Sequence, residues 1–215
     1  MNAPLGLLGG TFDPVHFAHL RLAEEAIEAL GLSGVLWLPS GVGAHREAPR
    51  ASAADRLAMV GLALAQHPRF GIDAAEAGSP APSYTVPTLE RLRAALGATL
   101  PLVLLLGADA FLGLPAWHRW TELFALAHLA VATRPGHELD EAAMAAALAG
   151  EFGDRRGVAA DLALAPAGAI VPFALTALDI SATAIRARLA AGASCRYLLP
   201  DAVLDYIDRH RLYSH

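Results

Sequence analysis

Short apolar, β-prone runs alternate with helical patterns along the whole chain, and this alternation constrains the fold more than any other feature. The six apolar runs are Leu5–Gly9, Val35–Leu38, Arg69–Ala74, Pro101–Leu106, Leu129–Thr133 and Ala169–Pro172. The helical patterns are Ala18–Leu30, Ser52–Ala65, Val86–Leu96, Leu139–Leu148, Ser181–Ala191 and Pro200–His210. Strands that alternate with helices predict an α/β fold: a doubly wound parallel sheet with helices on both faces and further helices at the C-terminal end.

The length of the chain favours a single domain. At roughly 100–200 residues per domain, 215 residues leave little room for a second one. We therefore expect one domain over 1–215, with a core of about 1–180 and a C-terminal helical portion of about 181–215. The proline-containing stretch Ala74–Ser83 is expected to be a loop and not a boundary, because the alternation resumes directly after it.

Composition excludes several classes of protein. With 55% hydrophobic and 17% charged residues, the chain is not disordered. No run reaches about 18 apolar residues, so no membrane span is expected, and the first residues lack the basic and long apolar regions of a secretory leader. The single Cys195 excludes a disulfide framework and suits the reducing cytoplasm. A formal charge of −5 argues against broad nucleic-acid binding and still allows a local phosphate site.

The segment after the first apolar run carries the strongest chemical signal. Gly9 and Gly10 end the predicted strand without Cβ atoms, so a ligand can approach the backbone closely. His16 and His19 are three residues apart at the start of the predicted helix and project from one face. Free amides at that helix end favour an anion, and the imidazoles can donate hydrogen bonds to phosphate oxygens.

Each of these features alone is more often incidental, but their combination predicts a phosphate site. Two histidines with this spacing are also compatible with a metal. No cysteine or neighbouring acid completes a ligand set, so we expect no metal site built from protein side chains.

The segment Gly9-Gly10-Thr11-Phe12-Asp13-Pro14-Val15-His16 resembles the first signature of the HxGH nucleotidyltransferases, and most closely that of the bacterial nicotinate mononucleotide adenylyltransferases. The resemblance implies a Rossmann-like fold and a catalytic role for His16 and His19. It also implies that ATP binds along Gly9, Gly10, Thr11 and Phe12. The chain departs from the family at Ala18, where a methyl group replaces the family's glycine beside the phosphate site.

A second stretch, Ile180-Ser181-Ala182-Thr183-Ala184-Ile185-Arg186, resembles the other signature of the family. Ser181 is a good N-cap for the helix that follows, and Arg186 supplies a fixed cationic fork one turn later. On its own this is an ordinary capped helix with a surface arginine. The resemblance implies that Ile180, Ser181, Thr183 and Arg186 bind ATP, with the hydroxyls and the guanidinium at the β- and γ-phosphates.

The loop after the second predicted strand differs from the family pattern. The family has Pro-Pro-His-Lys where this chain has Gly43-Ala44-His45-Arg46. The resemblance implies a catalytic contact between Arg46 and the triphosphate, although arginine and lysine present their charge differently. The alternative is a solvated loop charge.

Two further motifs follow in the family's order. Ser83-Tyr84-Thr85 lies at the start of a predicted helix, whose first amides can face an anion. The resemblance implies that nicotinate mononucleotide binds at Thr85. Gly107-Ala108-Asp109 ends a core strand, and the resemblance assigns Gly107 and Asp109 to ATP, with Asp109 on the ribose hydroxyls. Asp109 is equally compatible with a helix N-cap.

The segment Trp117-His118-Arg119-Trp120 resembles the family's Trp-x-x-Trp region. Trp117 offers a flat face to a cationic pyridinium ring, and a backbone amide near His118 suits the nicotinate carboxylate. Trp120 is expected in the core. Arg134 matches the family's Arg-Pro-Gly and is placed in the nicotinate mononucleotide site, where it either lines the site or supports it.

The implied reaction joins ATP and nicotinate mononucleotide to give nicotinate adenine dinucleotide and pyrophosphate, with Mg²⁺ on the phosphates. Alternatives within the superfamily are a pantetheine-phosphate adenylyltransferase and a cytidylyltransferase; a different class is a nucleotide-binding module without turnover. A dehydrogenase fits poorly, because Gly6-x-x-Gly9-Gly10 is not Gly-x-Gly-x-x-Gly. The sequence carries no signal for an oligomeric state.

Overall fold

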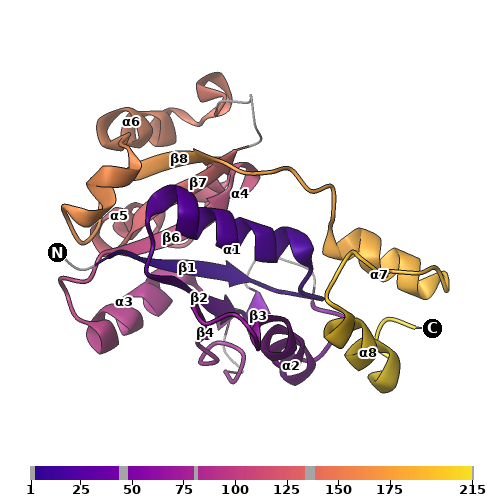
Figure 1. The fold of residues 1–215 in the computed structure, drawn as a ribbon. Coiled ribbons are helices and arrows are strands. Elements are labelled where there is room, and N and C mark those ends of the chain that lie inside the picture. The colour runs from indigo at the N-terminus through magenta and orange to yellow at the C-terminus, as the bar shows by residue number, and fades with distance from the viewer. Residues whose placement is uncertain (1–2, 44–47, 80–81, 134–138, 215) are drawn as a thin grey trace. The chain divides into compact units, whose positions relative to one another are not determined.

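The computed structural model describes residues 3–43, 48–79, 82–133 and 139–214 (Figure 1). Six parallel strands form one sheet in the order β4-β2-β1-β6-β7-β8. The order runs outward from β1 in both directions, which is the doubly wound arrangement predicted from the sequence. The predicted fold class is therefore confirmed.

The six predicted apolar runs correspond to the six strands of this sheet. They are β1 (Leu5–Gly10), β2 (Gly34–Pro39), β4 (Phe70–Ile72), β6 (Leu102–Gly107), β7 (His128–Thr133) and β8 (Ile170–Ala174). A second, two-stranded sheet pairs β3 (Val42–Gly43) with β5 (Pro82–Ser83). These two strands were not predicted, because two residues are too few to show a periodicity. Strand β5 also falls within Ala74–Ser83, so the expected loop is wrong at its last two residues.

Five helices lie where the sequence places them: α1 (Phe17–Leu30), α2 (Ala53–Leu64), α3 (Thr85–Leu96), α7 (Ala182–Ala190) and α8 (Asp201–His210). The short helices α4 (Ala108–Leu112) and α5 (Leu123–Leu126) were not predicted, and α6 spans Ala146–Arg155. Short 3₁₀ turns lie at Leu114–Ala116, Trp120–Glu122, Glu141–Ala143 and Ala159–Ala163. None of the described helices is long and apolar enough to cross a membrane.

The predicted helix Leu139–Leu148 is wrong in its bounds. The Asp140 carboxylate caps only the single turn Glu141–Ala143, by accepting from the Ala142 amide. The chain then turns to bury Met144, and α6 begins at Ala146. An alanine-rich stretch has helix propensity throughout, so propensity does not show where the chain turns.

The chain forms two compact units. The first unit comprises residues 1–8, 22–36 and 84–176, and the second comprises 9–21, 37–83 and 177–215. Strands β1 and β2 and helix α1 each run from one unit into the other. The expectation of a single domain over 1–215 stays a prediction.

The first unit is built around β6, β7 and β8, which lie side by side in Figure 1. Val103 pairs with His128, and Leu129 pairs with Ile170. Residues Leu102–Leu106 are all buried, as expected of a parallel strand covered on both faces. The guanidinium of Arg93 on α3 donates to the carbonyls of Leu100, Leu126 and Pro166 and thereby ties the surrounding loops to the helix.

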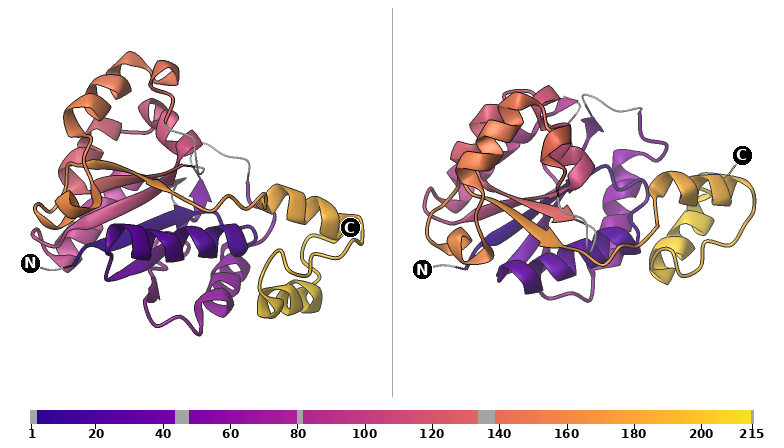
Figure 2. Two further views of the ribbon diagram at one scale, coloured as in Figure 1. Left: turned by 45° about the horizontal axis from the view of Figure 1, so that its top comes forward. Right: turned by 90° about the horizontal axis from the view of Figure 1, so that it is seen from above.

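The second unit holds the two-stranded sheet and helices α2, α7 and α8. Helix α2 begins at a Ser52 cap and buries Arg56, Met59 and Val60 along one face. Helix α8 packs beside α2 (Figure 2), where the Tyr206 hydroxyl donates to Asp55 at 3.0 Å. This unit contains both signature segments of the sequence.

Candidate active site

A tight turn after β1 positions the first signature in the second unit. Gly9 is exposed, and a Cβ there would meet open space, as expected for close approach by a ligand. A Cβ on Gly10 would instead collide with the ring of Phe12, so this glycine makes room for a core side chain. Phe12 adopts a left-handed backbone conformation (φ 50°), buries its ring against Trp37, and is followed by the cis peptide between Asp13 and Pro14.

The two histidines form a stacked pair directly after this turn. Their ring centroids are 3.7 Å apart with an interplanar angle of 22°, and Phe12 packs edge-on against His19. The His16 amide donates to Nδ1 of His19 at 3.3 Å. Because a backbone amide can only donate, His19 Nδ1 is an acceptor, and a neutral ring must carry its proton on Nε2. His19 therefore presents an Nε2–H donor.

Burial keeps both imidazoles neutral at physiological pH. The pKa of His16 falls to about 4 because the ring is buried. The pKa of His19 falls to about 3, because burial and then the neighbouring His16 both oppose a positive charge. Nδ1 of His16 is buried and has no hydrogen-bond partner among the described residues. The pair therefore offers neutral hydrogen-bond donors and not fixed cations.

Two of the main-chain amides at the start of α1 are already engaged. The Phe17 amide donates to the Leu198 carbonyl at 3.1 Å, and the His16 amide is used by His19. The expectation that the amides at this helix end are free for an anion is therefore wrong for these two. The imidazoles are side-chain donors that this turn presents in addition to any remaining amides.

The second signature begins α7, also in the second unit. Oγ of Ser181 accepts from the Ala184 amide at 3.2 Å, which confirms the predicted N-cap, and its own proton remains to be donated. Ile180 is half-buried, whereas Ser181 and Thr183 are exposed. The guanidinium of Arg186 donates to Oγ1 of Thr183 at 3.2 Å.

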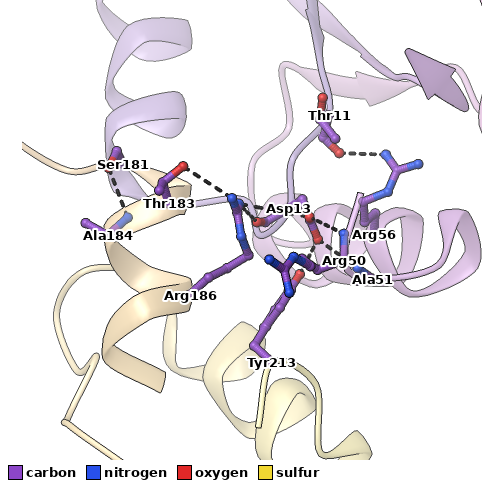
Figure 3. A network of polar contacts seen from close by, with 10 residues as sticks. All are labelled: Thr11, Asp13, Arg50, Ala51, Arg56, Ser181, Thr183, Ala184, Arg186 and Tyr213. Atoms are coloured by element: carbon purple, nitrogen blue, oxygen red, sulfur yellow. Dashed lines mark hydrogen bonds and ion pairs between the residues drawn. The ribbon is translucent and has the colours of Figure 1, made fainter. Parts of the chain in front are cut away.

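Arg186 also contacts the first signature, as Figure 3 shows. Its Nη1 donates to the main-chain carbonyl of Asp13 at 2.8 Å and lies 4.0 Å from the Asp13 carboxylate. Segments 173 residues apart in the sequence therefore meet within this unit. Arg186 uses two of its N–H groups in these hydrogen bonds and keeps others for a ligand.

The buried carboxylate of Asp13 is the centre of a polar network (Figure 3). It accepts from the amides of Arg50 at 2.7 Å and Ala51 at 3.1 Å, and from the hydroxyl of Tyr213 at 2.6 Å. These contacts fix the turn that leads into the histidine pair. Burial and the adjacent Asp13 carboxylate raise the pKa of the Tyr213 phenol, so Tyr213 stays a donor.

Arg56 on α2 supports the same turn through separate hydrogen bonds. Its side chain is 1% exposed, and its guanidinium donates to the carbonyls of Thr11 at 2.6 Å and Gly41 at 2.9 Å. Burial lowers the pKa of this guanidinium, and the negative charge of Asp13 opposes that shift. Arg56 thereby holds the turn after β1 against the chain that follows β2.

Three of the residues predicted for nicotinate mononucleotide, Thr85, Trp117 and His118, lie in the first unit. Helix α3 begins at Thr85 without a side-chain cap, so its first amides have no partner within the helix. The rings of Tyr84 and His118 are 4.9 Å apart, which brings the Trp117–His118 turn next to the start of α3. Trp117 is half-buried and His118 is exposed.

Asp109 lies in the first turn of α4, also in the first unit. Gly107 is the N-cap residue of this helix, so the alternative that Asp109 is the N-cap is wrong. Both Gly107 and Asp109 are exposed at the end of β6. Trp120 was expected in the core, but it is only half-buried, with its ring edge-on to Phe124, so this expectation is wrong.

The predicted residues thus fall into two groups. His16, His19 and the Ser181–Arg186 segment share the second unit, whereas Asp109, Thr85 and the Trp117–His118 turn share the first. Two predicted residues, Arg46 and Arg134, lie outside the described residues.

Comparison with known proteins identifies the family. A family model for cytidylyltransferase-like proteins matches residues 7–188. A relative from Dechloromonas aromatica named "Probable nicotinate-nucleotide adenylyltransferase" is 58% identical over 216 residues and covers all of both chains. A relative of the same name from Cellvibrio japonicus is 46% identical and covers 99% of this chain and 100% of its own. The chain belongs to the nicotinate-nucleotide adenylyltransferase family.

Solved structures support the fold independently. The nicotinic acid mononucleotide adenylyltransferase of Plasmodium falciparum, complexed with NaAD, matches with a TM-score of 0.72 over 99% of this chain and 98% of its own. At 14% identity this similarity speaks for the fold alone. Family and fold together confirm the predicted resemblance and the predicted class of enzyme, a nucleotidyltransferase.

Sequence reasoning missed three residues of the network around the first signature. Arg56 left a signal, because a charged residue stands on the apolar face of a helix with Met59 and Val60. Asp13 lies within the recognised motif but received no role. Tyr213 left no local signal, since its partner lies 200 residues away.

Proposed function

We propose that the protein joins ATP and nicotinate mononucleotide, giving nicotinate adenine dinucleotide and pyrophosphate. One observation carries the proposal most directly: the neutral His19 presents an Nε2–H donor beside His16, in the unit that also holds Arg186. Donors of this kind suit a triphosphate whose charge redistributes during the reaction. The names of the full-length relatives support the choice of substrates.

The reaction needs positioned donors and no strong base. A phosphate oxygen of nicotinate mononucleotide is already ionised at neutral pH and attacks the α-phosphorus of ATP. The bond from the α-phosphorus to the oxygen that bridges to the β-phosphorus breaks, and pyrophosphate leaves with that oxygen. Catalysis of such a transfer consists mainly of positioning and charge stabilisation. Two imidazoles with pKa values of about 4 and 3 match this role, because they donate without taking up protons.

The second unit holds the triphosphate in this proposal. His16 and His19 contact the phosphate oxygens around the α-phosphorus, with the backbone of Gly9, Gly10, Thr11 and Phe12 alongside. Ser181, Thr183 and Arg186 hold the β- and γ-phosphates that leave, with Ile180 beside them. Arg46, which is not among the described residues, is proposed to contact the same phosphates.

The first unit holds the ribose and the pyridine. Asp109 accepts from the ribose hydroxyls of ATP, next to Gly107. Trp117 stacks on the pyridinium ring. Amides near Thr85 and His118 face the nicotinate carboxylate, and Arg134 is assigned to the same site. Amides can only donate, so they favour a carboxylate over the amide of nicotinamide mononucleotide.

We propose Mg²⁺ as the cofactor, bound to the phosphates of ATP. When bound, the ion supplies neutralisation of the leaving pyrophosphate. Mg²⁺ prefers oxygen ligands and retains several waters, so it needs few ligands from the protein. Within the described ranges, His, Cys, Asp and Glu side chains form no group of three that could hold a metal ion. Phosphate oxygens and water are therefore the proposed ligands.

We also propose that residues 1–215 act as one catalytic domain in the cytoplasm. The buried free thiol of Cys195 suits a reducing compartment.

A substrate panel tests the proposal. Pyrophosphate release from ATP is measured with nicotinate mononucleotide, nicotinamide mononucleotide and pantetheine phosphate, and CTP replaces ATP in a parallel series. We expect the highest kcat/KM for ATP with nicotinate mononucleotide. Preference for pantetheine phosphate or CTP would favour the other superfamily activities, and binding of ATP without turnover of any pair would favour a nucleotide-binding module.

A further inference from the structure

The contact between Tyr213 and Asp13 lies outside both signature motifs yet reaches the turn before the histidine pair. We propose that the Tyr213 hydroxyl is a positioning group for the triphosphate: it holds the Asp13 carboxylate away from Arg186, so that the Arg186 guanidinium stays available to phosphate. The inference rests on the proposed role of Arg186 in ATP binding. All the residues involved belong to the second unit (Figure 3).

The geometry shows a carboxylate that forms only a long ion pair with the guanidinium, without a hydrogen bond between them. Asp13 Oδ2 is 4.0 Å from Arg186 Nη1, beyond the 2.7–3.2 Å range typical of an N–H···O hydrogen bond. Arg186 instead donates to the main-chain carbonyl of Asp13 at 2.8 Å. The carboxylate is satisfied elsewhere, by the amides of Arg50 and Ala51 and by the Tyr213 hydroxyl.

Tyr213 makes a distinct contribution among these donors. Its hydroxyl approaches Oδ1 at 2.6 Å, a short distance typical of a donor to an ionised carboxylate. The two amides belong to the backbone and stay after any side-chain substitution, so Tyr213 is the donor that a point mutation can remove. The phenol is neutral, and it therefore stabilises the charge of Asp13 without adding a cation beside the phosphate site.

Removal of this hydroxyl has a specific consequence. Oδ1 would keep only the Ala51 amide, and the carboxylate would turn toward the adjacent guanidinium, because direct Arg–carboxylate pairs are strong. Arg186 would then be shared between Asp13 and the triphosphate. Binding of polyphosphate should weaken, whereas the nicotinate mononucleotide site in the first unit should be unaffected.

The chain offers a matched control in Tyr206. Its hydroxyl also donates to a carboxylate, Asp55 at 3.0 Å, from the same C-terminal part of the second unit. Asp55 has its own partner in Ser52 and no described contact with Asp13 or Arg186. Tyr206→Phe therefore removes the same kind of hydrogen bond without touching the network.

The experiment compares wild type, Tyr213→Phe and Tyr206→Phe by calorimetric titration with inorganic tripolyphosphate and by initial rates with ATP and nicotinate mononucleotide. We expect Tyr213→Phe to raise the Kd for tripolyphosphate and the KM for ATP about 10-fold, the scale of losing one hydrogen bond to a charged group. The KM for nicotinate mononucleotide should not change, and Tyr206→Phe should match wild type. A loss of stability alone would lower the apparent kcat and leave both KM values unchanged.

Three results would overturn the inference: unchanged tripolyphosphate binding in Tyr213→Phe, an equal loss in Tyr206→Phe, or a lower kcat with both KM values unchanged. A double-mutant cycle with Asp13→Asn adds a further check, because Tyr213→Phe should cost little once the carboxylate is gone. If wild type releases no pyrophosphate, the proposed function fails, and the tripolyphosphate titration still decides the inference.

Discussion

Arg186 in the second unit and Arg119 in the first both lie in segments that resemble substrate-binding motifs of the family. Their guanidinium groups, however, have different hydrogen-bond partners. Arg119 has a left-handed backbone (φ 57°) and pairs with Glu122 at 2.6 Å and Glu90 at 2.7 Å. Hydrogen bonds to Glu122 and then Glu90 raise its pKa further. Arg186 has no direct carboxylate partner within hydrogen-bond distance among the described residues and donates to a carbonyl and a hydroxyl.

Arg119 is therefore a structural arginine, whereas Arg186 keeps N–H groups available to an anion. The Arg119 pairs lie on the surface, where solvent screening leaves an ion pair with little effect on stability. Asp13 and Arg56 in the second unit are buried, and buried polar groups are costly to leave without hydrogen bonds. Substitutions in the second unit should therefore have large effects, and substitutions in the Arg119 cluster should have small ones.

The largest effect is expected from Arg56→Met. The substitution keeps most of the side-chain volume but leaves the carbonyls of Thr11 and Gly41 without their buried charged donor. We expect a loss of about 3 kcal/mol in the free energy of unfolding, measured by urea denaturation. A loss no larger than that of an exposed substitution would show that the buried network does not stabilise the second unit.

The second-largest effect is expected on the turnover number. His19→Ala removes the Nε2–H donor while the fold stays intact, and we expect kcat to fall at least about 100-fold, the scale of losing one transition-state donor. Circular dichroism and Tm serve as controls for folding. Near-normal turnover in a folded variant would exclude the proposed role of His19.

The depressed pKa of His16 predicts a pH-dependent stability. Between about pH 6.5 and pH 4 the unfolded chain binds a proton on His16 that the folded chain does not, so stability rises with pH across this window. We expect wild type to lose about 2 kcal/mol more than His16→Gln between pH 7 and pH 5. Urea titrations at the two pH values measure this difference, and parallel losses in both proteins would contradict it.

A smaller effect is expected at the pyridine site. Trp117→Ala removes the face proposed to stack on the pyridinium ring, and the KM for nicotinate mononucleotide should rise about 10-fold. The KM for ATP should change little. An unchanged KM for nicotinate mononucleotide would place the ring elsewhere.

The smallest effect is expected from Arg119→Gln. The Arg119 pairs with Glu90 and Glu122 are exposed, so kcat/KM should stay within about twofold of wild type. A large increase in the KM for nicotinate mononucleotide would show instead that this cluster orients the Trp117–His118 turn.

Much of the fold follows from the sequence because its signals are local. The six apolar runs of the sequence correspond to the six parallel strands of the sheet. Ser181 caps α7, as its position before the helix predicts. The two-residue strands β3 and β5 are too short to show an alternation of apolar and polar residues. The alanine-rich stretch before α6 has the same helix propensity throughout and so does not show where the chain turns.

The site residues that belong to short sequence motifs could be predicted from the sequence. Those whose role depends on a contact with a residue far away in the sequence could not. His16, His19 and Arg186 stand in recognised signatures. The tautomer of His19 depends on a contact with the His16 amide, and the buried state of both rings depends on packing. The link from Tyr213 to Asp13 is a tertiary contact that no short pattern records.

The most direct test of the account is a matrix of initial rates with both substrates varied, for Arg186→Gln beside Trp117→Ala. If the second unit binds the triphosphate and the first binds the pyridine nucleotide, Arg186→Gln raises the KM for ATP alone, and Trp117→Ala raises the KM for nicotinate mononucleotide alone. If both substitutions raise the KM for the same substrate, the proposed assignment of the triphosphate to the second unit and of the pyridine nucleotide to the first is wrong.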